Sequence, residues 1–365
     1  MVLRHLRFSG WRNLEDVSLE LGPRVTVFFG KNGQGKTNIL EGAYYAIGFR
    51  SFRTSSTADL ILLGRENAEI EAGFTLRGLQ RLMRVQVAVG KKTTALDGKA
   101  VRRDSDSLDG AGIVVFGPDD LRLLKAPASE RRRVLDRAVF AVRRSYYREA
   151  LTFERALKAR NGLLRRGGFP PKLLESHDET LALAGARVVF RRREVAAALA
   201  PGFAAAFSDI HGDRKASLRY RSHVLVEEAT TESEIGEALR VGLAEGRSHD
   251  ERRGFTGFGP QTDDVEVFLG ERLARDHGSQ GQMRSLVLAL KIAELHHASE
   301  CNRETPLLLL DDVASELDEE RRARLFETIS SMACQTLITI TEREHLPALP
   351  GRVDWQVSGG QITLA

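Results

Sequence analysis

The sequence predicts an α/β fold in which a lobe built on a mixed sheet carries an inserted, mostly helical lobe. Three observations support this prediction: an apolar strand at 25–29 runs into a glycine-rich loop and a helix, the middle of the chain has helical spacing, and strand patterns return near the end. A chain of 365 residues is long enough for two lobes. We therefore expect 1–120 and 256–365 to share one lobe and 121–255 to form the other.

The first 120 residues are rich in strand patterns. Residues 1–20 alternate charged and apolar side chains, which indicates a strand and not the apolar segment of a signal peptide. Alternation continues through Ile70, Ala72, Phe74 and Leu76, and again through Met83, Val85, Val87 and Val89. This spacing predicts antiparallel strands with one solvated face, with turns at Gly78-Leu79 and Asp97-Gly98.

The glycine-rich loop fits the pattern G-x-x-x-x-G-K-[ST] in full. It reads Gly30-Lys31-Asn32-Gly33-Gln34-Gly35-Lys36-Thr37, and Asn38 continues into the predicted helix. Glycines let backbone N–H groups close around a phosphate, and the helix N-terminus adds partial positive charge. Lys36 is expected to reach the β- and γ-phosphates, and Thr37 to offer its hydroxyl to Mg²⁺. The loop therefore predicts a nucleoside triphosphate ligand; the alternative, a chance glycine-rich turn, does not explain the strand and helix around it.

The middle of the chain has a helical pattern. Apolar residues recur every three or four positions over 135–157 and 181–199, and a segment rich in glycine and proline, 167–171, separates the two stretches. We expect a helical lobe that contains a short hairpin of helices, without an extended coiled coil.

The helical segment is also strongly basic. Residues 121–221 hold 23 Lys and Arg against 10 Asp and Glu, a charge of +13, whereas the rest of the chain holds 31 against 40, a charge of −9. A basic segment in a chain that is otherwise acidic indicates a surface that binds a polyanion. A solvated helix surface is the alternative, since arginine favours helices.

Cysteine usage and hydropathy indicate a cytoplasmic protein. Cys301 and Cys334 form no C-x-x-C pair and have no histidines at metal-ligand spacing, which favours a reducing compartment and no zinc site. No stretch approaches 18 apolar residues, so we expect no membrane span.

The last hundred residues return to an α/β pattern. Strands are predicted at 265–269, 306–310 and 336–340, a helix at 283–295, and a closing hairpin that turns at Gly359-Gly360. The apolar run before Asp311 and Asp312 is typical of a Walker B strand. Asp311 would hold Mg²⁺ through water, and Asp312 would orient or deprotonate the attacking water. Alone this pattern is weak, because apolar runs often end in aspartate.

A second loop strengthens the nucleotide interpretation. Gly278-Ser279-Gln280-Gly281-Gln282 precedes Asp311 by about thirty residues, heads a helix and resembles the signature loop of ABC-type ATPases. In that superfamily the loop closes over the γ-phosphate bound by a partner subunit, which implies that Ser279, Gly281 and Gln282 act in trans. The alternative is a polar helix cap in which Ser279 is the N-cap.

Taken together, the motifs resemble the RecF family, recombination-repair ATPases related to the heads of structural-maintenance-of-chromosomes proteins. The match spans nearly the whole chain. It includes Phe8, Arg12 and Asn13, then Asn32 to Glu41, Arg53-Thr54-Ser55, Phe116 to Leu121, Arg131 to Asp136, Ser279 to Gln282 and Asp311 to Asp318.

The resemblance implies an ABC-type ATPase head with ATP and Mg²⁺ as ligands and with Arg12 and Asn13 at the nucleotide. It further implies a homodimer formed on ATP binding, contact with double-stranded, gapped or junction DNA, and weak, DNA-stimulated ATP hydrolysis. RecR and RecO would be partners in loading RecA. Asp312 is one methylene shorter than the glutamate usual at the water-positioning place, so we expect slow turnover.

DNA contacts are expected to use phosphates with little base readout, because the basic segment has few interleaved aromatic residues. Some of its arginines are instead expected to pair with acidic residues elsewhere in the chain. The candidates are Arg131, Arg132, Arg133, Arg143, Arg144, Arg191, Arg192 and Arg193.

Two segments depart from the family pattern. Gly259-Pro260-Gln261-Thr262-Asp263-Asp264 resembles the family's Gly-Pro-His-Arg-Asp-Asp, with Gln261 and Thr262 in place of the basic pair. Phe52 stands where a histidine is expected. Contacts that those residues make in relatives are therefore not carried over.

Three other functions share parts of this pattern. A transporter's nucleotide-binding subunit has the same motif order, but it would normally carry histidine in the strand after Walker B, where this chain has Ile340-Thr341-Glu342. An anti-phage ATPase-nuclease would carry an acidic nuclease domain after the ATPase, and we expect none here. A DNA scaffold that uses ATP as a switch without productive hydrolysis stays open.

Overall fold

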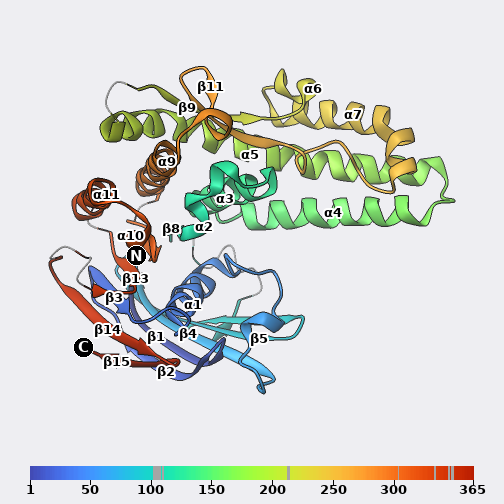
Figure 1. Ribbon diagram of the computed structural model, residues 1–365. Helices are drawn as coiled ribbons and strands as arrows, with labels where there is room; N and C mark the ends of the chain where they lie inside the picture. Colours follow the sequence, from blue (N-terminus) through green and yellow to red (C-terminus); the bar gives the residue numbers. More distant parts are fainter. Residues whose placement is uncertain are drawn as a thin grey trace. The chain divides into compact units, whose positions relative to one another are not determined.

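The computed structural model describes the chain except for residues 102–107, 109–110, 212–213, 303, 333, 344–345 and 347–348. The described residues form two compact units, which Figure 1 shows coloured along the sequence. Unit 1 comprises Met1–Leu121 and Glu294–Ala365, and unit 2 comprises Arg122–Ala293. The return to unit 1 comes later than the expected residue 256, because β10 (Asp264–Leu269) pairs with β9 (Ala216–Arg221) inside unit 2.

Unit 1 contains an antiparallel sheet made from the first hundred residues. Its strand order is β2 (Leu14–Glu20), β1 (Val2–Trp11), β4 (Asn67–Leu76), β5 (Leu79–Ala88), β6 (Lys91–Leu96) and β7 (Lys99–Ala100). Two of its turns pair a positive-φ residue with glycine: φ is 52° and 76° at Arg77 and Gly78, and 51° and 77° at Asp97 and Gly98. Such turns match the twist of antiparallel strands, so the predicted hairpins form where the glycines allow them.

The second sheet of unit 1 joins the two ends of the chain. Its order is β15 (Gln361–Leu364), β14 (Arg352–Ser358), β3 (Val25–Phe29), β13 (Thr336–Ile340), β12 (Leu307–Asp311) and β8 (Ile113–Phe116). All neighbours are parallel except β14 and β15. Strands β8, β12 and β13 are buried throughout, as expected for parallel strands covered on both faces.

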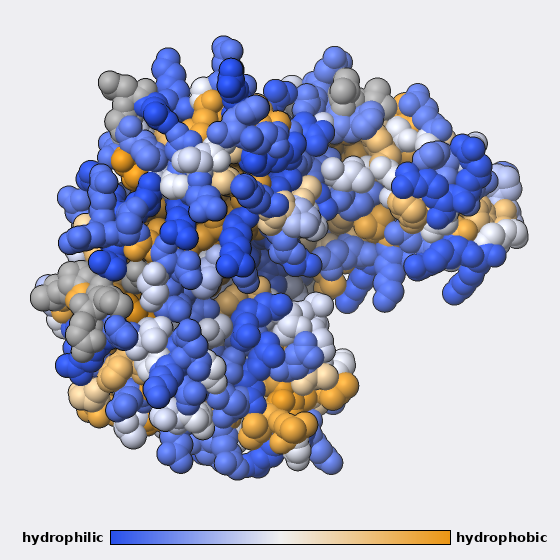
Figure 2. Space-filling view, in the orientation of Figure 1, coloured by the Kyte–Doolittle hydropathy of each residue, from blue (hydrophilic) through white to orange (hydrophobic). Residues whose placement is uncertain are grey.

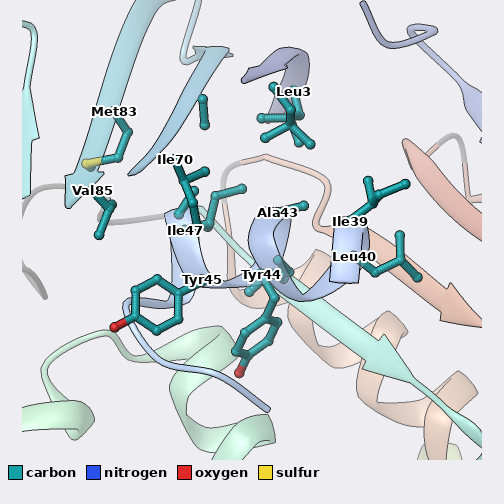
Figure 3. Close-up of a cluster of buried hydrophobic side chains, with 14 of the residues drawn as sticks. Leu3, Ile39, Leu40, Ala43, Tyr44, Tyr45, Ile47, Ile70, Met83 and Val85 are labelled. Atoms are coloured by element: carbon teal, nitrogen blue, oxygen red, sulfur yellow. The ribbon is translucent and has the colours of Figure 1, made fainter. Parts of the chain in front are cut away.

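Helix α1 (Lys36–Gly48) contacts strands of both sheets. It is buried on nearly every side, which explains why its sequence lacks a polar face. Figure 3 shows its apolar side chains, among them Tyr44 and Ile47, gathered with Ile70 and Val85 of the antiparallel sheet. The remaining elements of unit 1 are η1 (Ala58–Leu60), α2 (Pro118–Leu121), α10 (Val313–Glu316) and α11 (Glu319–Ser331). This core fixes the start of α1 against the carboxyl ends of β3 and β12.

Unit 2 is mostly helical with one small sheet. Its elements are η3 (Leu123–Lys125), α3 (Ala128–Val142), α4 (Tyr146–Arg166), α5 (Pro171–His211), α6 (Val224–Glu227), α7 (Glu232–Arg253), β11 (Arg272–Leu273), α8 (Ala274–His277) and most of α9 (Gln280–Cys301), in addition to β9 and β10. The continuous periodicity over 135–157 does not give one helix, because Arg143 is extended (φ −139°) and α4 starts anew at Tyr146. Tyr146 donates its hydroxyl to Asp136, which ties α4 back to α3.

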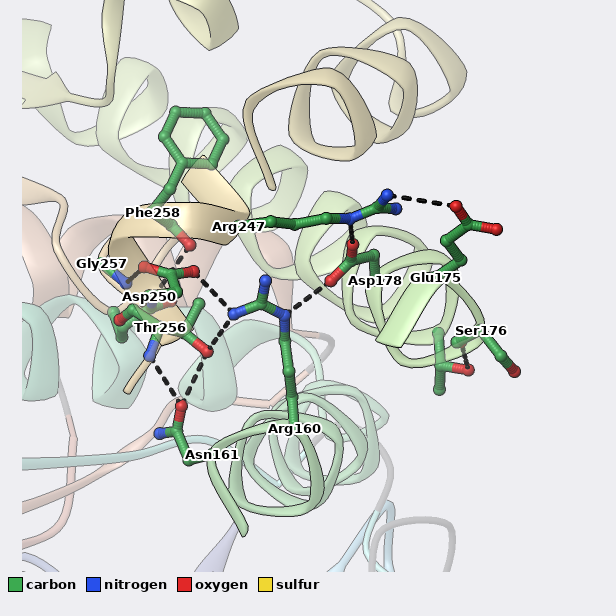
Figure 4. A network of polar contacts seen from close by, with 12 residues as sticks. Arg160, Asn161, Glu175, Ser176, Asp178, Arg247, Asp250, Thr256, Gly257 and Phe258 are labelled. Carbon is green, nitrogen blue, oxygen red and sulfur yellow. Dashed lines mark hydrogen bonds and ion pairs between the residues drawn. The ribbon is translucent and has the colours of Figure 1, made fainter. Parts of the chain in front are cut away.

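A buried charge network holds three of these helices together (Figure 4). Arg160 of α4 donates to Asp178 of α5 at 2.6 Å and to Asp250 of α7 at 2.7 Å. All three side chains are at most 2% exposed. Arg247 adds a second bond to Asp178, at 2.6 Å. The network pairs these charges inside unit 2.

Candidate nucleotide site

The phosphate loop between β3 and α1 depends on its glycines. Gly30, Gly33 and Gly35 have φ of 151°, 80° and 111°, which side chains other than glycine rarely adopt. A Cβ on Gly30 would lie 2.2 Å from the carbonyl oxygen of Val357, and one on Gly35 would lie 2.6 Å from Oδ1 of Asn13. Gly30 and Gly35 are therefore required both by conformation and by close neighbours, and Gly33 by conformation alone.

Lys36 is held at the loop. Its Nζ donates to the carbonyl oxygens of Gly30 at 2.5 Å and Lys31 at 3.0 Å. Burial lowers the pKa of Lys36, and the charges of Asp312 and Asp311 oppose this shift. The ammonium group thus lies between the loop and the acidic pair, where a phosphate group would neutralise it.

The two residues predicted to hold Mg²⁺ meet although they are far apart in sequence. Thr37 donates its hydroxyl to Oδ1 of Asp311 at 2.8 Å, and Thr339 donates to the same oxygen at 2.7 Å. Burial raises the pKa of Asp311, while both hydroxyls oppose the shift. The parallel pairing of β12 with β13 and of β13 with β3 brings these strand ends to one edge of the sheet.

This donor set fits a hard cation. The hydroxyl and the carboxylate are oxygen ligands of the kind that Mg²⁺ prefers, and Mg²⁺ usually takes only one or two protein ligands beside waters and phosphate. In the part of the chain that the structure describes, no group of three His, Cys, Asp or Glu side chains could form a self-contained metal centre. A cation at Thr37 and Asp311 would therefore be shared with a bound nucleotide.

Asp312 turns the chain sharply after the strand. Its φ is 52°, a left-handed conformation that aspartate tolerates better than most residues. Its N–H donates to the carbonyl oxygen and the hydroxyl of Thr339 at 3.1 and 2.9 Å, and Ser315 donates to its Oδ1 at 2.7 Å. The side chain is thereby fixed beside Asp311, as a group that orients water would need.

A buried carboxylate, Glu41, organises the first turns of α1. Arg12 donates to both of its oxygens, at 2.8 and 2.7 Å, and Arg53 donates at 3.2 Å. The Glu41 side chain is fully buried, whereas those of Arg12 and Arg53 are 17% and 41% exposed. The sequence motifs include Glu41 and Arg53 without assigning them a role. A lone acid among apolar residues of the helix is the signal that could have marked Glu41.

Asparagines connect this cluster to the phosphate loop. Arg53 donates to Oδ1 of Asn38 at 2.8 Å, and Asn38 donates to Oδ1 of Asn13 at 2.8 Å. Asn13 in turn donates to the carbonyl oxygen of Gln34 at 3.1 Å. Arg12, Asn13 and Asn38, all predicted nucleotide residues, therefore lie in one hydrogen-bonded chain beside the loop.

The signature segment forms a reciprocal helix cap in unit 2. The N–H of Ser279 donates to Oε1 of Gln282 at 2.9 Å, and the N–H of Gln282 donates to the hydroxyl of Ser279 at 3.2 Å. This capping box leaves Ser279 exposed at the N-terminus of α9, with Gly281 in the first turn. The capping arrangement and an anion contact are compatible, because helix N-termini attract phosphate. Contact of Ser279, Gly281 and Gln282 with a partner's nucleotide stays a prediction.

Three of the eight arginines predicted to contact DNA lie in the interior of unit 2. Arg131 forms two bonds of 2.7 Å with Asp264, and Arg192 forms bonds of 2.7 and 2.9 Å with Asp136. Arg144 is 4% exposed and lies over the ring of Phe140. These three side chains serve the packing of the unit, so their assignment to DNA contacts is not carried further.

The other five arginines are more accessible but also have partners. Arg132 donates to the carbonyl oxygen of Asp263, and Arg193 to those of Ala229 and Val226. Arg143 and Arg191 lie near Glu194, and Arg133 pairs with Glu130 while staying 69% exposed. Of the eight, Arg133 is thus the best placed for an outside contact.

A different set of cations is exposed along α4. It consists of Arg155, Lys158, Arg165 and Arg166, which we call the α4 stripe. Their spacing puts them on the side opposite the buried Phe153 and Arg160. Among the described residues, none of the four has an ion-pair partner, and Figure 2 colours the surface over α4 hydrophilic. Arg155, Arg165 and Arg166 also lack an acidic residue three or four positions away, a signal that the total charge count hides.

No described helix is long and apolar enough to span a membrane. The family model described as RecF/RecN/SMC N terminal domain matches residues 2–350. A DNA replication and repair protein RecF from Anaeromyxobacter sp. (strain K) is 42% identical over 370 residues, which cover 100% of this chain and 99% of that protein. The chain belongs to the RecF family. The proposed resemblance to this family is therefore confirmed, and the transporter alternative is excluded.

Solved structures agree with this membership in RecF. The recombination mediator protein RecF-ATPrS in the RecFOR pathway has a TM-score of 0.90 and 28% identity, covering 99% of this chain and 97% of that one. An SMC head bound to the C-winged helix domain of ScpA has a TM-score of 0.57 at 16% identity, covering 100% and 97%. The predicted ABC/SMC-type ATPase head fold is thus confirmed.

Proposed function

We propose that this RecF-family protein binds ATP with Mg²⁺ and uses the bound nucleotide to control its hold on DNA in recombination repair. The observation that carries the proposal is the meeting of Thr37 with Asp311 at 2.8 Å, next to the buried Lys36. A RecF relative that is described with ATP supports the choice of nucleotide. The same relative is described in the RecFOR pathway, which supports RecR and RecO as partners, and RecA loading is the outcome that we propose.

Each residue of the loop has a defined task in this proposal. Lys36 leaves the carbonyl oxygens of the loop to bind the β- and γ-phosphates. Thr37 and Asp311 hold the cation, which neutralises phosphate charge when bound. Asp312 orients a water, and its short side chain supports a slow reaction. Replacement by the longer glutamate, Asp312→Glu, is expected to raise phosphate release sharply; an unchanged rate in a folded variant would contradict this role.

A second copy would complete the site. The exposed Ser279 and the first N–H groups of α9 offer hydrogen-bond donors and a positive helix end to a γ-phosphate. Because a twofold dimer uses the same surface on both copies, two nucleotides would be enclosed together. ATP binding would thereby be read out as dimer formation.

DNA contact in this proposal uses the α4 stripe, together with Arg133. The exposed cations of the α4 stripe have no ion-pair partner among the described residues, and the pair of Arg133 with Glu130 is exposed, so these cations can displace counterions from a phosphate backbone, which buried ion pairs cannot do. The affinity should therefore fall steeply with salt and depend little on sequence.

Solution mass measured with ATP, with ADP and without nucleotide tests the proposed function. We expect a dimer with ATP alone, lost in Ser279→Arg, because arginine at the exposed cap would block the approach of a second nucleotide. Ser233→Arg, at an exposed serine in the first turn of α7, is the matched control and should still form a dimer. A dimer that ignores nucleotide would refute the proposal. Phosphate release with and without duplex DNA separates an ATPase from a scaffold, which would release none.

A further inference from the structure

The turn between β14 and β15 contacts the phosphate loop from the far end of the chain. The N–H of Gly359 donates to Oε1 of Gln34 at 2.6 Å, and the N–H of Gly360 donates to the carbonyl oxygen of Gln34 at 3.1 Å. The first of these bonds links positions 325 residues apart. Gln34 is one of the variable positions of the phosphate motif, so nothing in the motif itself calls for such a partner.

At Gly360, the second residue of the turn, the contact is too close for any residue but glycine. Gly359 and Gly360 have φ of 57° and 80°. A Cβ on Gly360 would lie 2.3 Å from the carbonyl oxygen of Asn13. Since that neighbour is backbone, a side chain at Gly360 would displace the hairpin from the loop.

A second close approach joins the same elements. Strand β14 runs beside β3, with Gln356 opposite Phe29, and the loop leaves β3 at Gly30. There a Cβ would lie 2.2 Å from the carbonyl oxygen of Val357. Hairpin and loop therefore touch at both the first and the fifth position of the motif.

The hydrogen bonds to Gln34 set the direction of a phosphate-binding group. Its carbonyl oxygen accepts from Gly360 and from the side chain of Asn13, both at 3.1 Å. In a trans peptide the carbonyl and the next N–H point in opposite directions. Fixing this oxygen toward the hairpin directs the N–H of Gly35 away from it, and that N–H is one of those the motif offers to phosphate.

We propose that the β14–β15 turn is a positioning part of the nucleotide site, in which Gly359 and Gly360 hold Gln34 so that the phosphate loop is preformed for ATP. The inference rests on the proposed function, since it assumes that the loop binds ATP. Linkage makes the effect reciprocal: if the hairpin stabilises the binding-competent loop, ATP stabilises the hairpin by the same free energy.

Titration of the full chain with a fluorescent ATP analogue and Mg²⁺ tests the proposal. Gly360→Ala should weaken binding by about tenfold or more. Gln34→Ala, which removes the hydrogen bond from Gly359 and a long one to Asn32, should weaken it by roughly fivefold. Gly351→Ala is the matched control: Gly351 also has positive φ (69°) and lies at the other end of β14, but its added Cβ would meet only the side chain of Arg24, at 3.8 Å. It should bind the analogue like the unaltered chain.

Two readouts separate positioning from loss of structure. Gly351→Ala should lower the thermal midpoint through backbone strain alone, and Gly360→Ala should lower it further because its Cβ also meets the carbonyl oxygen of Asn13. Only Gly360→Ala should raise the KM for ATP, with phosphate release at saturation unchanged. In the unaltered chain, ATP should slow amide exchange of residues 355–365, and Gln34→Ala should reduce that protection.

The outcomes distinguish the two proposals. No binding of the analogue by the unaltered chain would overturn the proposed function and this inference with it. Binding by the unaltered chain, with equal affinities for Gly360→Ala and Gly351→Ala, would overturn the inference alone.

Discussion

The two units bury charge in opposite ways. In unit 1 the buried partner is a carboxylate, Glu41, and the arginines that bond to it, Arg12 and Arg53, are 17% and 41% exposed. In unit 2 the buried partner is a cation, Arg160, and its carboxylates at Asp178 and Asp250 are at most 2% exposed. Cations that reach the surface beside a phosphate loop can act on a ligand, whereas an enclosed network serves only the fold. Among these arginines, burial of the guanidinium group thus separates the two roles.

Two buried acids, Asp264 of unit 2 and Asp311 of unit 1, also differ in their partners: only Asp264 is bonded to a cation. Burial tends to raise the pKa of Asp264, but hydrogen bonding and charge from Arg131 lower it below the ordinary value. Asp311 receives only hydroxyl donors in its hydrogen bonds, and burial raises its pKa. Asp264 is thus neutralised by a bonded arginine, whereas Asp311 has no bonded cation among the described residues at the place where Mg²⁺ is expected.

The largest effect should come from breaking the enclosed network. Arg160→Met leaves Asp178 and Asp250 buried without their shared cation, so we expect the free energy of unfolding to fall by about 3–5 kcal/mol. Urea-induced unfolding measures it. Arg240→Met, which removes an exposed arginine paired with Glu237, should change little. A loss no larger than that of Arg240→Met would show that the network contributes nothing to the fold.

Weakening the cluster of Glu41 with Arg12 and Arg53 should reduce the affinity for ATP more than the stability of the fold. In Glu41→Gln the carboxylate charge is lost, yet Arg12 and Arg53 can reach water, so we expect a stability loss of about 1–3 kcal/mol. ATP affinity should fall roughly tenfold, since Arg53 also bonds to Asn38 beside the loop. Isothermal titration measures the affinity. The control Glu71→Gln, which removes a pair with Arg84 on the open sheet face, should keep full affinity. Equal affinities of the two variants would contradict the positioning role.

Loss of unpaired, exposed cations of the α4 stripe should lower the affinity for DNA, whereas loss of arginines that are paired with acids should not. The double change Arg155→Ala and Lys158→Ala is expected to weaken duplex binding about tenfold and to reduce the salt slope by roughly 1–2. Fluorescence anisotropy at several salt concentrations gives both values. The matched pair Arg187→Ala and Arg240→Ala removes exposed arginines that already bond to acids. If this control weakened binding more than the first pair, the α4 stripe would not be the DNA surface.

The smallest expected effect is a shift in pH dependence. Asp311 must be ionised to hold a cation, and its pKa is raised above 3.8, so Mg²⁺-ATP binding should weaken in acid at a pH above that value. The hydroxyl of Thr339 favours the ionised form, so Thr339→Val should move the midpoint upward, by less than about one pH unit. ATP titrations across the acid range show it. A midpoint that moved downward would contradict the assignment.

Much of unit 1 could be predicted because its signals are local. The glycines of the phosphate motif predict the backbone conformation of the loop. Parallel strands that end at one edge of the sheet place Asp311 near Thr37. Glu41 could not be assigned, because its partners Arg12 and Arg53 come from separate loops. In unit 2 the arginine count predicted a basic surface. Arg131 instead forms a buried ion pair with Asp264, which lies 133 residues further along the chain. Ion pairs between distant segments leave no periodic pattern, so they could not be predicted. The α4 stripe was missed because the total charge count hides the lack of acids near three of its four cations.

The central claim is that the phosphate loop of one copy and the signature segment of another form one site. Mixing Lys36→Met with Ser279→Arg tests it, since each variant alone lacks a complete site while a mixed dimer restores one. We expect each variant alone to release no phosphate above background and an equal mixture to recover up to about a quarter of the unaltered rate, by random pairing. Activity of Ser279→Arg alone, or no recovery from two folded variants, would contradict the claim.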